Sequence, residues 1–113
     1  MIQQTQAYTT LTDSNFESET NEGYVVVDFW AEWCGPCLAF APVFEKVAEE
    51  MGEKVKFAKL NVDDNPSIAQ KFGVMSIPTI ILLKDGKEVS RQMGAMPEVM
   101  FRNWLENQLE SDK

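Results

Sequence analysis

Residues 24–37 read YVVVDFWAEWCGPC, and this segment carries the strongest signal of the fold class. Its first half, residues 24–30, is β-branched and aromatic and hardly alternates between apolar and polar side chains, which is typical of a central strand covered on both faces. From Pro36 onward, apolar residues recur every three or four positions as far as Met51, which predicts a helix that ends at Gly52. The two cysteines therefore lie where a buried strand gives way to a helix.

The remainder of the chain predicts further strands and helices around this junction. They are a short helix begun by residues 12–15, a strand at 55–62, a short helix at 65–73, strands at 79–83 and about 88–92, and an amphipathic helix at 97–110 with an inner stripe of Met100, Phe101, Trp104 and Leu105. Asp85-Gly86 between two apolar runs is a strong hairpin signal, and Pro42 is expected to kink the long helix. These elements predict a layered α/β domain with a mixed sheet.

Composition narrows the class of protein. The 113 residues suit one domain, and 44% apolar with 25% charged residues is a globular mixture. Eighteen acidic and ten basic residues give a net charge of −8, so we expect binding neither to nucleic acid nor to a membrane surface. Residues 1–10 contain no Lys, no Arg and no apolar run, so we expect no secretory signal there. The chain has no His, which excludes Ser/His and Cys/His catalysis.

The cysteines, Cys34 and Cys37, enclose a Gly-Pro pair at the start of the predicted helix. At the first helical turn, free backbone N–H groups and the helix dipole favour an anion, so the pKa of Cys34 should fall. Cys37 lies one turn later on the same helix face and can reach back to Cys34. Pro36 presets a helical φ, and Gly35 allows another chain to approach closely. This arrangement favours thiol–disulfide exchange, in which a thiolate is the nucleophile.

Three other interpretations of the cysteine pair remain open at this point. A structural disulfide closing so short a loop would contribute about 2 kcal/mol, less than longer loops do. A zinc half-site would need four ligands, and the chain offers neither His nor a second Cys pair. The third interpretation is that both cysteines are inert core residues. The Gly-Pro turn argues against it, because such a turn at a helix start is expected to expose the cysteines.

Several motifs in order resemble the thioredoxin family. They are residues 28–37 and Ile77-Pro78-Thr79, with further matches at residues 59–63, 84–86 and 94–95, and the similarity runs from about residue 8 to 110. The resemblance implies a thioredoxin fold, in which a central mixed five-stranded β-sheet is flanked by four α-helices. It implies a single domain over residues 1–113, with residues 1–8 as a short, loosely ordered N-terminal extension.

The resemblance also implies a function, that of a protein-disulfide reductase working through a reversible Cys34–Cys37 disulfide. Cys34 would be the nucleophile and Cys37 the resolving thiol. Asp28 would accept the proton of Cys37, and Lys59 would modulate Asp28. From the residues alone, Asp28 could instead lie at a strand end or on a wet face, and Lys59 could be a solvated strand residue. Burying an ionised carboxylate is costly, so the pKa of a buried Asp28 should rise unless it is paired.

The resemblance also implies a flat apolar docking surface for protein substrates, formed by residues 33–36, 77–78 and 93–95. Its residues would be Trp33, Gly35, Pro36, Ile77, Pro78, Met93, Gly94 and Ala95. Pro78 would follow a cis peptide bond, and the backbone of Ile77 would pair with an extended substrate segment. Without the resemblance, Pro78 would be read as a strand start or edge. Trp30 is expected to pack in the core, and Trp33 to shield the disulfide from water.

Partners and location follow from the same resemblance. We expect an NADPH-dependent thioredoxin reductase, disulfide-containing protein substrates, no bound cofactor or metal, a monomer, and a cytoplasmic role in redox homeostasis. A disulfide oxidase or isomerase, and a redox-independent binding subunit, are the alternatives. One departure is Leu38, where bacterial family members commonly carry Lys. Because residues 1–45 hold seven acids and no Lys or Arg, activation of Cys34 cannot use a neighbouring cation in sequence.

Overall fold

The structure is a computed structural model that describes residues 7–111, and its strands pair in the order β1-β3-β2-β4-β5. The strands are β1 (Thr9–Leu11), β2 (Tyr24–Trp30), β3 (Lys56–Asn61), β4 (Thr79–Lys84) and β5 (Lys87–Met93). The helices are α1 (Phe16–Thr20), α2 (Gly35–Met51), α3 (Pro66–Lys71) and α4 (Glu98–Ser111). β1, β3 and β2 run parallel, whereas β4 and β5 add antiparallel strands, which gives the predicted mixed sheet.

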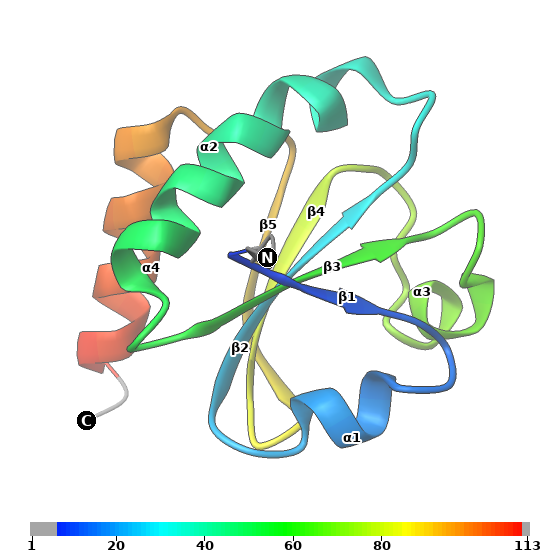
Figure 1. Cartoon of the computed structure of the whole chain (residues 1–113), viewed down its shortest axis with the longest axis horizontal. Helices are drawn as coiled ribbons and strands as arrows, with labels where there is room; N and C mark the ends of the chain where they lie inside the picture. Colours follow the sequence, from blue (N-terminus) through cyan, green and yellow to red (C-terminus); the bar gives the residue numbers. More distant parts are fainter. Residues whose placement is uncertain (1–6, 112–113) are drawn as a thin grey trace, which may run out of the picture.

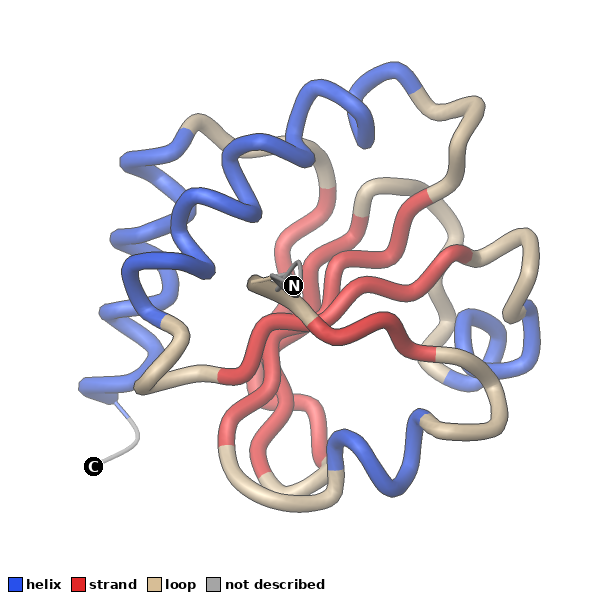
Figure 2. The backbone as a smooth tube through the Cα atoms, viewed as in Figure 1, coloured by secondary structure: helices blue, strands red, loops and turns tan. Residues whose placement is uncertain are grey.

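Helices cover both faces of the sheet, as Figures 1 and 2 show. On one face, α2 and α4 bury a core that includes Phe44 and Phe101 against Val26 and Phe57 of the sheet. On the other face, α1 and α3 pack over a core that includes Phe29. Because alternate residues of a strand point to opposite faces, β2 supplies apolar residues to both cores. This double coverage explains why the sequence of β2 scarcely alternates.

The ends of the strands and helices follow their local chemistry. Asp85 and Gly86 form the two-residue turn between β4 and β5 with φ values of 51° and 85°, the left-handed values that a type I′ hairpin turn needs. Pro42 lies inside α2, and Gly52 is the C-cap of that helix, as expected. The Asp13 carboxylate accepts hydrogen bonds from the backbone of Ser67 and Ile68 in α3 at 3.2 and 3.0 Å. A loop next to α1 thereby caps the N-terminal turn of α3.

Two elements differ from what the residue pattern predicts. The pattern gives no sign of β1, because its three residues are mostly polar and pair only at the edge of the sheet, with β3. In α4, Phe101 and Leu105 are fully buried, but Met100 is 58% exposed, so its place in the inner stripe is wrong. The buried side of α4 is centred on Phe101 and Leu105, which lie four positions apart, so Met100 lies at the edge of that side and is exposed.

The expected N-terminal extension, residues 1–8, falls mostly outside the described part of the chain. Ala7 and Tyr8 are described, and both pack against the core on the α2 side of the sheet. None of the helices within residues 7–111 is long and apolar enough to cross a membrane.

Candidate active site

Cys34 and Cys37 form a disulfide at the N-terminal end of α2, with their Cα atoms 5.2 Å apart. Cys34 is the N-cap residue, in an extended backbone conformation, and its Sγ accepts a hydrogen bond from the backbone N–H of Cys37 at 3.1 Å. Pro36 occupies the first turn, where its missing N–H costs nothing. The sulfur therefore lies at the positive end of the helix dipole, a position that stabilises a thiolate.

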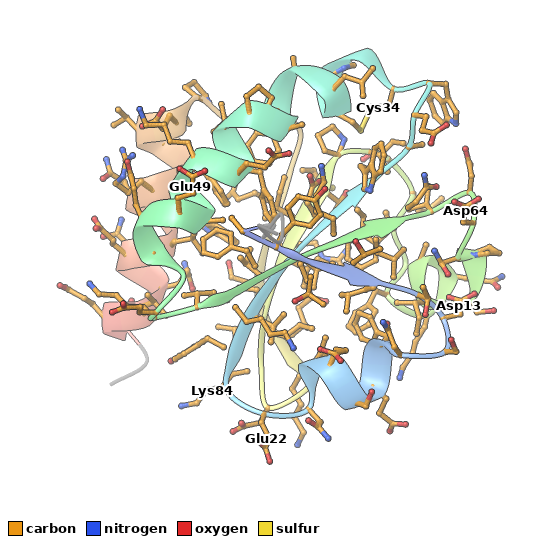
Figure 3. The ribbon with its side chains drawn as sticks, in the orientation of Figure 1. Asp13, Glu22, Cys34, Glu49, Asp64 and Lys84 are labelled. Atoms are coloured by element: carbon orange, nitrogen blue, oxygen red, sulfur yellow. A yellow bond between two sulfur atoms is a disulfide. The ribbon has the colours of Figure 1, made fainter. Side chains whose placement is uncertain are left out.

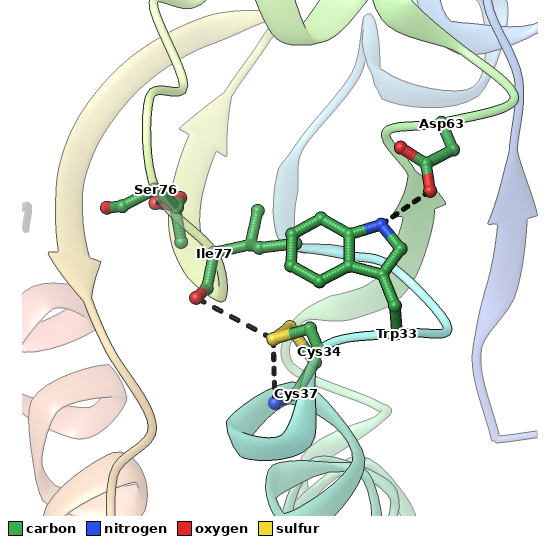
Figure 4. The surroundings of a disulfide bond; sticks show 7 residues. Trp33, Cys34, Cys37, Asp63, Ser76 and Ile77 are labelled. Carbon is green, nitrogen blue, oxygen red and sulfur yellow. Dashed lines mark hydrogen bonds between the residues drawn. A yellow bond between two sulfur atoms is a disulfide. The ribbon is translucent and has the colours of Figure 1, made fainter.

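Both cysteines are buried, which corrects the expectation that the Gly-Pro turn exposes them. Cys34 is 4% and Cys37 1% exposed, whereas Gly35 and Pro36 between them are exposed. The cause is the N-cap geometry, which folds the Cys34 side chain back over the helix end, together with the approach of a second loop. In that loop the carbonyl oxygen of Ile77 lies 3.7 Å from Cys34 Sγ (Figure 4).

The loop that approaches Cys34 is the one before β4. The Ile77–Pro78 peptide bond is cis, as the resemblance implies. The loop is tied at both ends: the Thr79 hydroxyl donates to the Ser76 carbonyl at 2.6 Å, and Gly94 N–H donates to the Pro78 carbonyl at 2.8 Å. The loop before β4 and the residues that follow β5 are thus joined by a hydrogen bond. The backbone of Ile77 is held next to Cys34 Sγ.

Trp33, immediately before the disulfide, is 70% exposed but not free. Its indole Nε1–H donates to a carboxylate oxygen of Asp63 at 2.8 Å, and Figure 4 shows the ring beside the disulfide and Ile77. The sequence pattern did not single out Asp63, because the contact joins residues thirty positions apart. The hydrogen bond fixes the orientation of an otherwise solvent-exposed ring.

The side chains around the disulfide form an exposed apolar rim. Besides Trp33, Leu38 is 52%, Met93 70% and Met75 95% exposed. Met75 was missed by the sequence reasoning, although a large apolar residue two positions before Ile77 is a signal that could have found it. Trp33, Met75 and Ile77 also line a shallow pocket of about 270 Å³. Large exposed apolar side chains gathered at one place are typical of a protein-binding surface.

Asp28 lies in the middle of β2 and is completely buried. Neither of its carboxylate oxygens has a hydrogen-bond partner in the described part of the chain. Burial raises the pKa of Asp28 from 3.8 to about 7, and the positive charge of Lys59 acts in the opposite direction. The strand-end and wet-face interpretations of Asp28 are therefore wrong, and the carboxyl group can hold or release a proton near neutral pH.

Lys59 is the register partner of Asp28 on β3 and is only 6% exposed, so it is not a solvated residue. Val26 and Phe57, two positions earlier on the same strands, face α2, so Asp28 and Lys59 face α2 as well. The Lys59 ammonium lies over the ring of Trp30 at 4.8 Å and that of Tyr8 at 5.2 Å. Trp30 is half-buried and belongs to neither apolar core; its ring contacts Lys59 instead, which corrects the expectation that it packs in the core.

The structure brings the predicted residues together in two groups. Cys34, Cys37, Trp33 and Ile77 lie around the disulfide, and Pro78 joins Gly94 to them through one hydrogen bond. Met93 is the register partner of Thr79, next to Pro78. Asp28 and Lys59 form the second group, inside the sheet on the face that α2 covers. Among residues 7–111 no three metal-ligating side chains gather at one place.

Comparison with known proteins agrees with this geometry. The family model described as thioredoxin matches residues 7–107. The thioredoxin of Bacillus subtilis is 48% identical over 98 residues, which cover 87% of this chain and 94% of that protein. The thioredoxin of Listeria monocytogenes is 52% identical over 88 residues, covering 78% and 85%. Thioredoxin 1 of Synechococcus elongatus is 44% identical over 101 residues, covering 88% and 94%.

The oxidase, isomerase and redox-independent alternatives are not favoured by these similarities, since the relatives carry the same family name throughout. Cys34 caps α2, Cys37 one turn later forms a disulfide with it, and the family model matches most of the chain; these observations lead to one conclusion. The chain belongs to the thioredoxin family of thiol–disulfide oxidoreductases, whose members act as protein-disulfide reductases.

Proposed function

We propose that the chain reduces protein disulfides with Cys34 as the nucleophile and Cys37 as the resolving thiol. The observation that carries this assignment is the position of Cys34 Sγ, which caps α2 and accepts a hydrogen bond from the backbone N–H of Cys37 at 3.1 Å. In the dithiol form, the same dipole stabilises Cys34 as a thiolate, whereas Cys37 lies inside the first turn and is more deeply buried.

The reaction proceeds in two exchanges. The Cys34 thiolate attacks one sulfur of the substrate disulfide, so that a mixed disulfide forms and the first substrate thiolate leaves. The Cys37 thiol then transfers its proton to the carboxylate of Asp28, through water, and the resulting thiolate attacks Cys34 Sγ. The Cys34–Cys37 disulfide forms, and the second substrate thiolate leaves. Two electrons have passed from this chain to the substrate, and the two substrate thiolates take up protons from solution.

Asp28 suits the role of proton acceptor because its pKa is close to 7. A base with a pKa near the working pH combines a useful deprotonated fraction with a useful affinity for the proton. Lys59, as the register partner, lowers the pKa of Asp28 and so increases the fraction that can accept a proton.

Substrate docking is proposed at the apolar rim and the loop before β4. The backbone of Ile77, beside Cys34, would pair with an extended segment of the substrate, and Trp33, Gly35, Pro36, Pro78, Met93, Gly94 and Ala95 would supply flat contacts. Main-chain pairing and flat contacts demand little side-chain identity, which suits a reductase of varied proteins.

The disulfide formed in each turnover has to be reduced again. We propose that an NADPH-dependent thioredoxin reductase does this, and that the chain works as a monomer in the cytoplasm, where other thiols are kept reduced. In that compartment it would contribute to redox homeostasis.

The test is reduction of insulin disulfides, followed as turbidity, by the chain with dithiothreitol or with NADPH and a bacterial thioredoxin reductase. We expect Cys34→Ser to abolish the activity, and Cys37→Ser to accumulate a mixed disulfide with the substrate. The reduction potential, measured against a glutathione buffer, should be strongly reducing. An oxidising potential would reverse the proposed direction of electron flow.

A further inference from the structure

Lys59 is flanked by two aromatic rings, one from the neighbouring strand β2 and one from the residue just before the neighbouring strand β1. β3 lies between β1 and β2 in the sheet. Trp30 ends β2, and Tyr8 directly precedes β1; their ring centroids lie 4.8 and 5.2 Å from the Lys59 nitrogen. Within residues 7–111 no carboxylate lies within ion-pair distance of that nitrogen. The rings therefore provide the favourable contact that a nearly buried ammonium needs.

Tyr8 reaches Lys59 because of the sheet register. Thr10 is the β1 partner of Lys59, so Tyr8, two positions earlier, points to the same face of the sheet. Its side chain is half-buried and packs against the core on the α2 side. A pocket of about 310 Å³ opens beside it, with Trp30 and Lys59 also in its lining. Without the Tyr8 ring, the flexible lysine chain would be free to turn into this pocket.

We propose that Tyr8 is a positioning residue, whose ring, together with that of Trp30, holds the Lys59 ammonium beside Asp28 and so sets how readily Asp28 accepts a proton. This inference rests on the proposed role of Asp28. The attraction between an ammonium and a carboxylate falls with their separation and with access of water. A lysine that swings into the pocket therefore stabilises the Asp28 carboxylate less, and Asp28 holds its proton to a higher pH.

The charge that acts on the pKa of Asp28 is that of Lys59, and the charge that acts on the pKa of Tyr8 is that of Glu45. From β3 the group is Lys59, and from β4 the register partner of Asp28 is the apolar Ile80. The charged residues of α2 are Glu45, Lys46, Glu49 and Glu50, and of these Glu45 acts on Tyr8. Cys37, also on α2, is held in the disulfide. Burial, followed by the negative charge of Glu45, raises the pKa of Tyr8, so Tyr8 is neutral near pH 7 and acts through its ring.

Glu32 and Asp64 complete the set, since both line the pocket that opens beside Lys59. An ammonium that leaves the rings would move toward these carboxylates and away from Asp28. The ring of Tyr8 therefore decides which acidic groups Lys59 stabilises.

The experiment is a titration of the Asp28 carboxyl by ¹³C NMR in oxidised protein with ¹³C-labelled aspartate, so that no cysteine titrates. The variants are Tyr8→Leu, which keeps apolar bulk without a ring, and Tyr8→Phe, which keeps the ring without the hydroxyl. We expect Tyr8→Leu to raise the pKa of Asp28 by about half a unit and Tyr8→Phe to leave it unchanged. Tyr8→Met is a second ring-free variant, in case Tyr8→Leu folds poorly.

Lys59→Met shows whether Tyr8 acts through the lysine. On its own it should raise the pKa of Asp28 by about one unit, and adding Tyr8→Leu to it should have no further effect. The proposal is overturned by an unchanged or lowered pKa in Tyr8→Leu, by an equal shift in Tyr8→Phe, or by a Tyr8→Leu shift that persists without Lys59. The titration needs no catalysis, so a chain that failed to reduce insulin would refute the proposed function and leave this measurement interpretable.

Discussion

Asp28 and Lys59 are the two charged side chains that are buried within the described residues, and they are register partners on β2 and β3. The pairing is incomplete, because the Asp28 oxygens have no hydrogen-bond partner in that part of the chain and the Lys59 ammonium contacts aromatic rings. Lys59 therefore offsets only part of the cost of burying Asp28, and the pKa of Asp28 stays near 7. A fully paired carboxylate would have a lower pKa and would be a poorer proton acceptor.

Replacing Asp28 with Asn should stabilise the fold in a pH-dependent way. The pKa of Asp28 is about 7 in the folded chain against 3.8 without burial, so the unfolded chain loses this proton first. The stability that the Asp28 carboxyl contributes is fully present below pH 3.8 and is lost as the pH rises to about 7. Above that pH it changes no further. The gain of Asp28→Asn should therefore be absent in acid and reach up to about 4 kcal/mol above neutrality.

Urea unfolding of the oxidised protein across this pH range measures the effect. Glu49→Gln is the matched control, because Glu49 is exposed on α2, away from Cys34, as Figure 3 shows. It should change stability by less than about 0.5 kcal/mol at every pH. An Asp28→Asn gain that did not vary with pH would show that burial of the charge is not its cause.

The same substitution should slow the second exchange of the reaction. With no proton acceptor, the Cys37 thiol must lose its proton to solvent, and we expect resolution of the mixed disulfide to fall at least about tenfold near pH 7. In the parent chain the rate should rise as the pH passes through about 7, the pKa of Asp28, and this inflection should be lost in Asp28→Asn. Stopped-flow reduction of a protein disulfide gives both results, and an unchanged rate would remove Asp28 from the mechanism.

Leu38 offers a test of how Cys34 is activated. It is 52% exposed in the first turn of α2, four residues after Cys34, and so lies on the same side of the helix. A lysine there would bring a cation near the sulfur, and we predict that Leu38→Lys slightly lowers the pKa of Cys34. Thiolate absorbance titrations of the two reduced proteins measure this. Coinciding curves would show that the helix end and the fold alone activate Cys34.

The Trp33–Asp63 hydrogen bond should matter for substrate docking more than for stability. Asp63→Ala removes the acceptor of the exposed indole, whereas Asp63→Asn keeps an oxygen that can accept. We expect Asp63→Ala to lower kcat/KM for a protein disulfide by about two- to fivefold and Asp63→Asn to have a smaller effect, since one such bond contributes about 1 kcal/mol. Equal kinetics for Asp63→Ala and the parent chain would show that the ring needs no anchor.

The local elements could be predicted because their signals are local. The unbroken apolar run of β2, the three- and four-residue spacing in α2 and the Asp85-Gly86 turn each reflect a constraint within a few residues. β1 escaped the residue pattern because an edge strand of three residues carries little periodicity. Met100 was misplaced because the side of α4 that is buried depends on where the sheet and α2 lie.

Residue types and their spacing indicate where the chemistry resides: two cysteines around Gly-Pro at a helix start, no His, and a carboxylate within an apolar strand. The burial and the contacts of these groups, in contrast, depend on how distant segments of the chain pack together. The burial of Cys34, its contact with the Ile77 carbonyl, the Trp33–Asp63 bond and the rings around Lys59 join residues from different strands and loops. The pKa of a buried group depends on water exclusion and on charges brought near by folding, and neither is encoded in neighbouring residues.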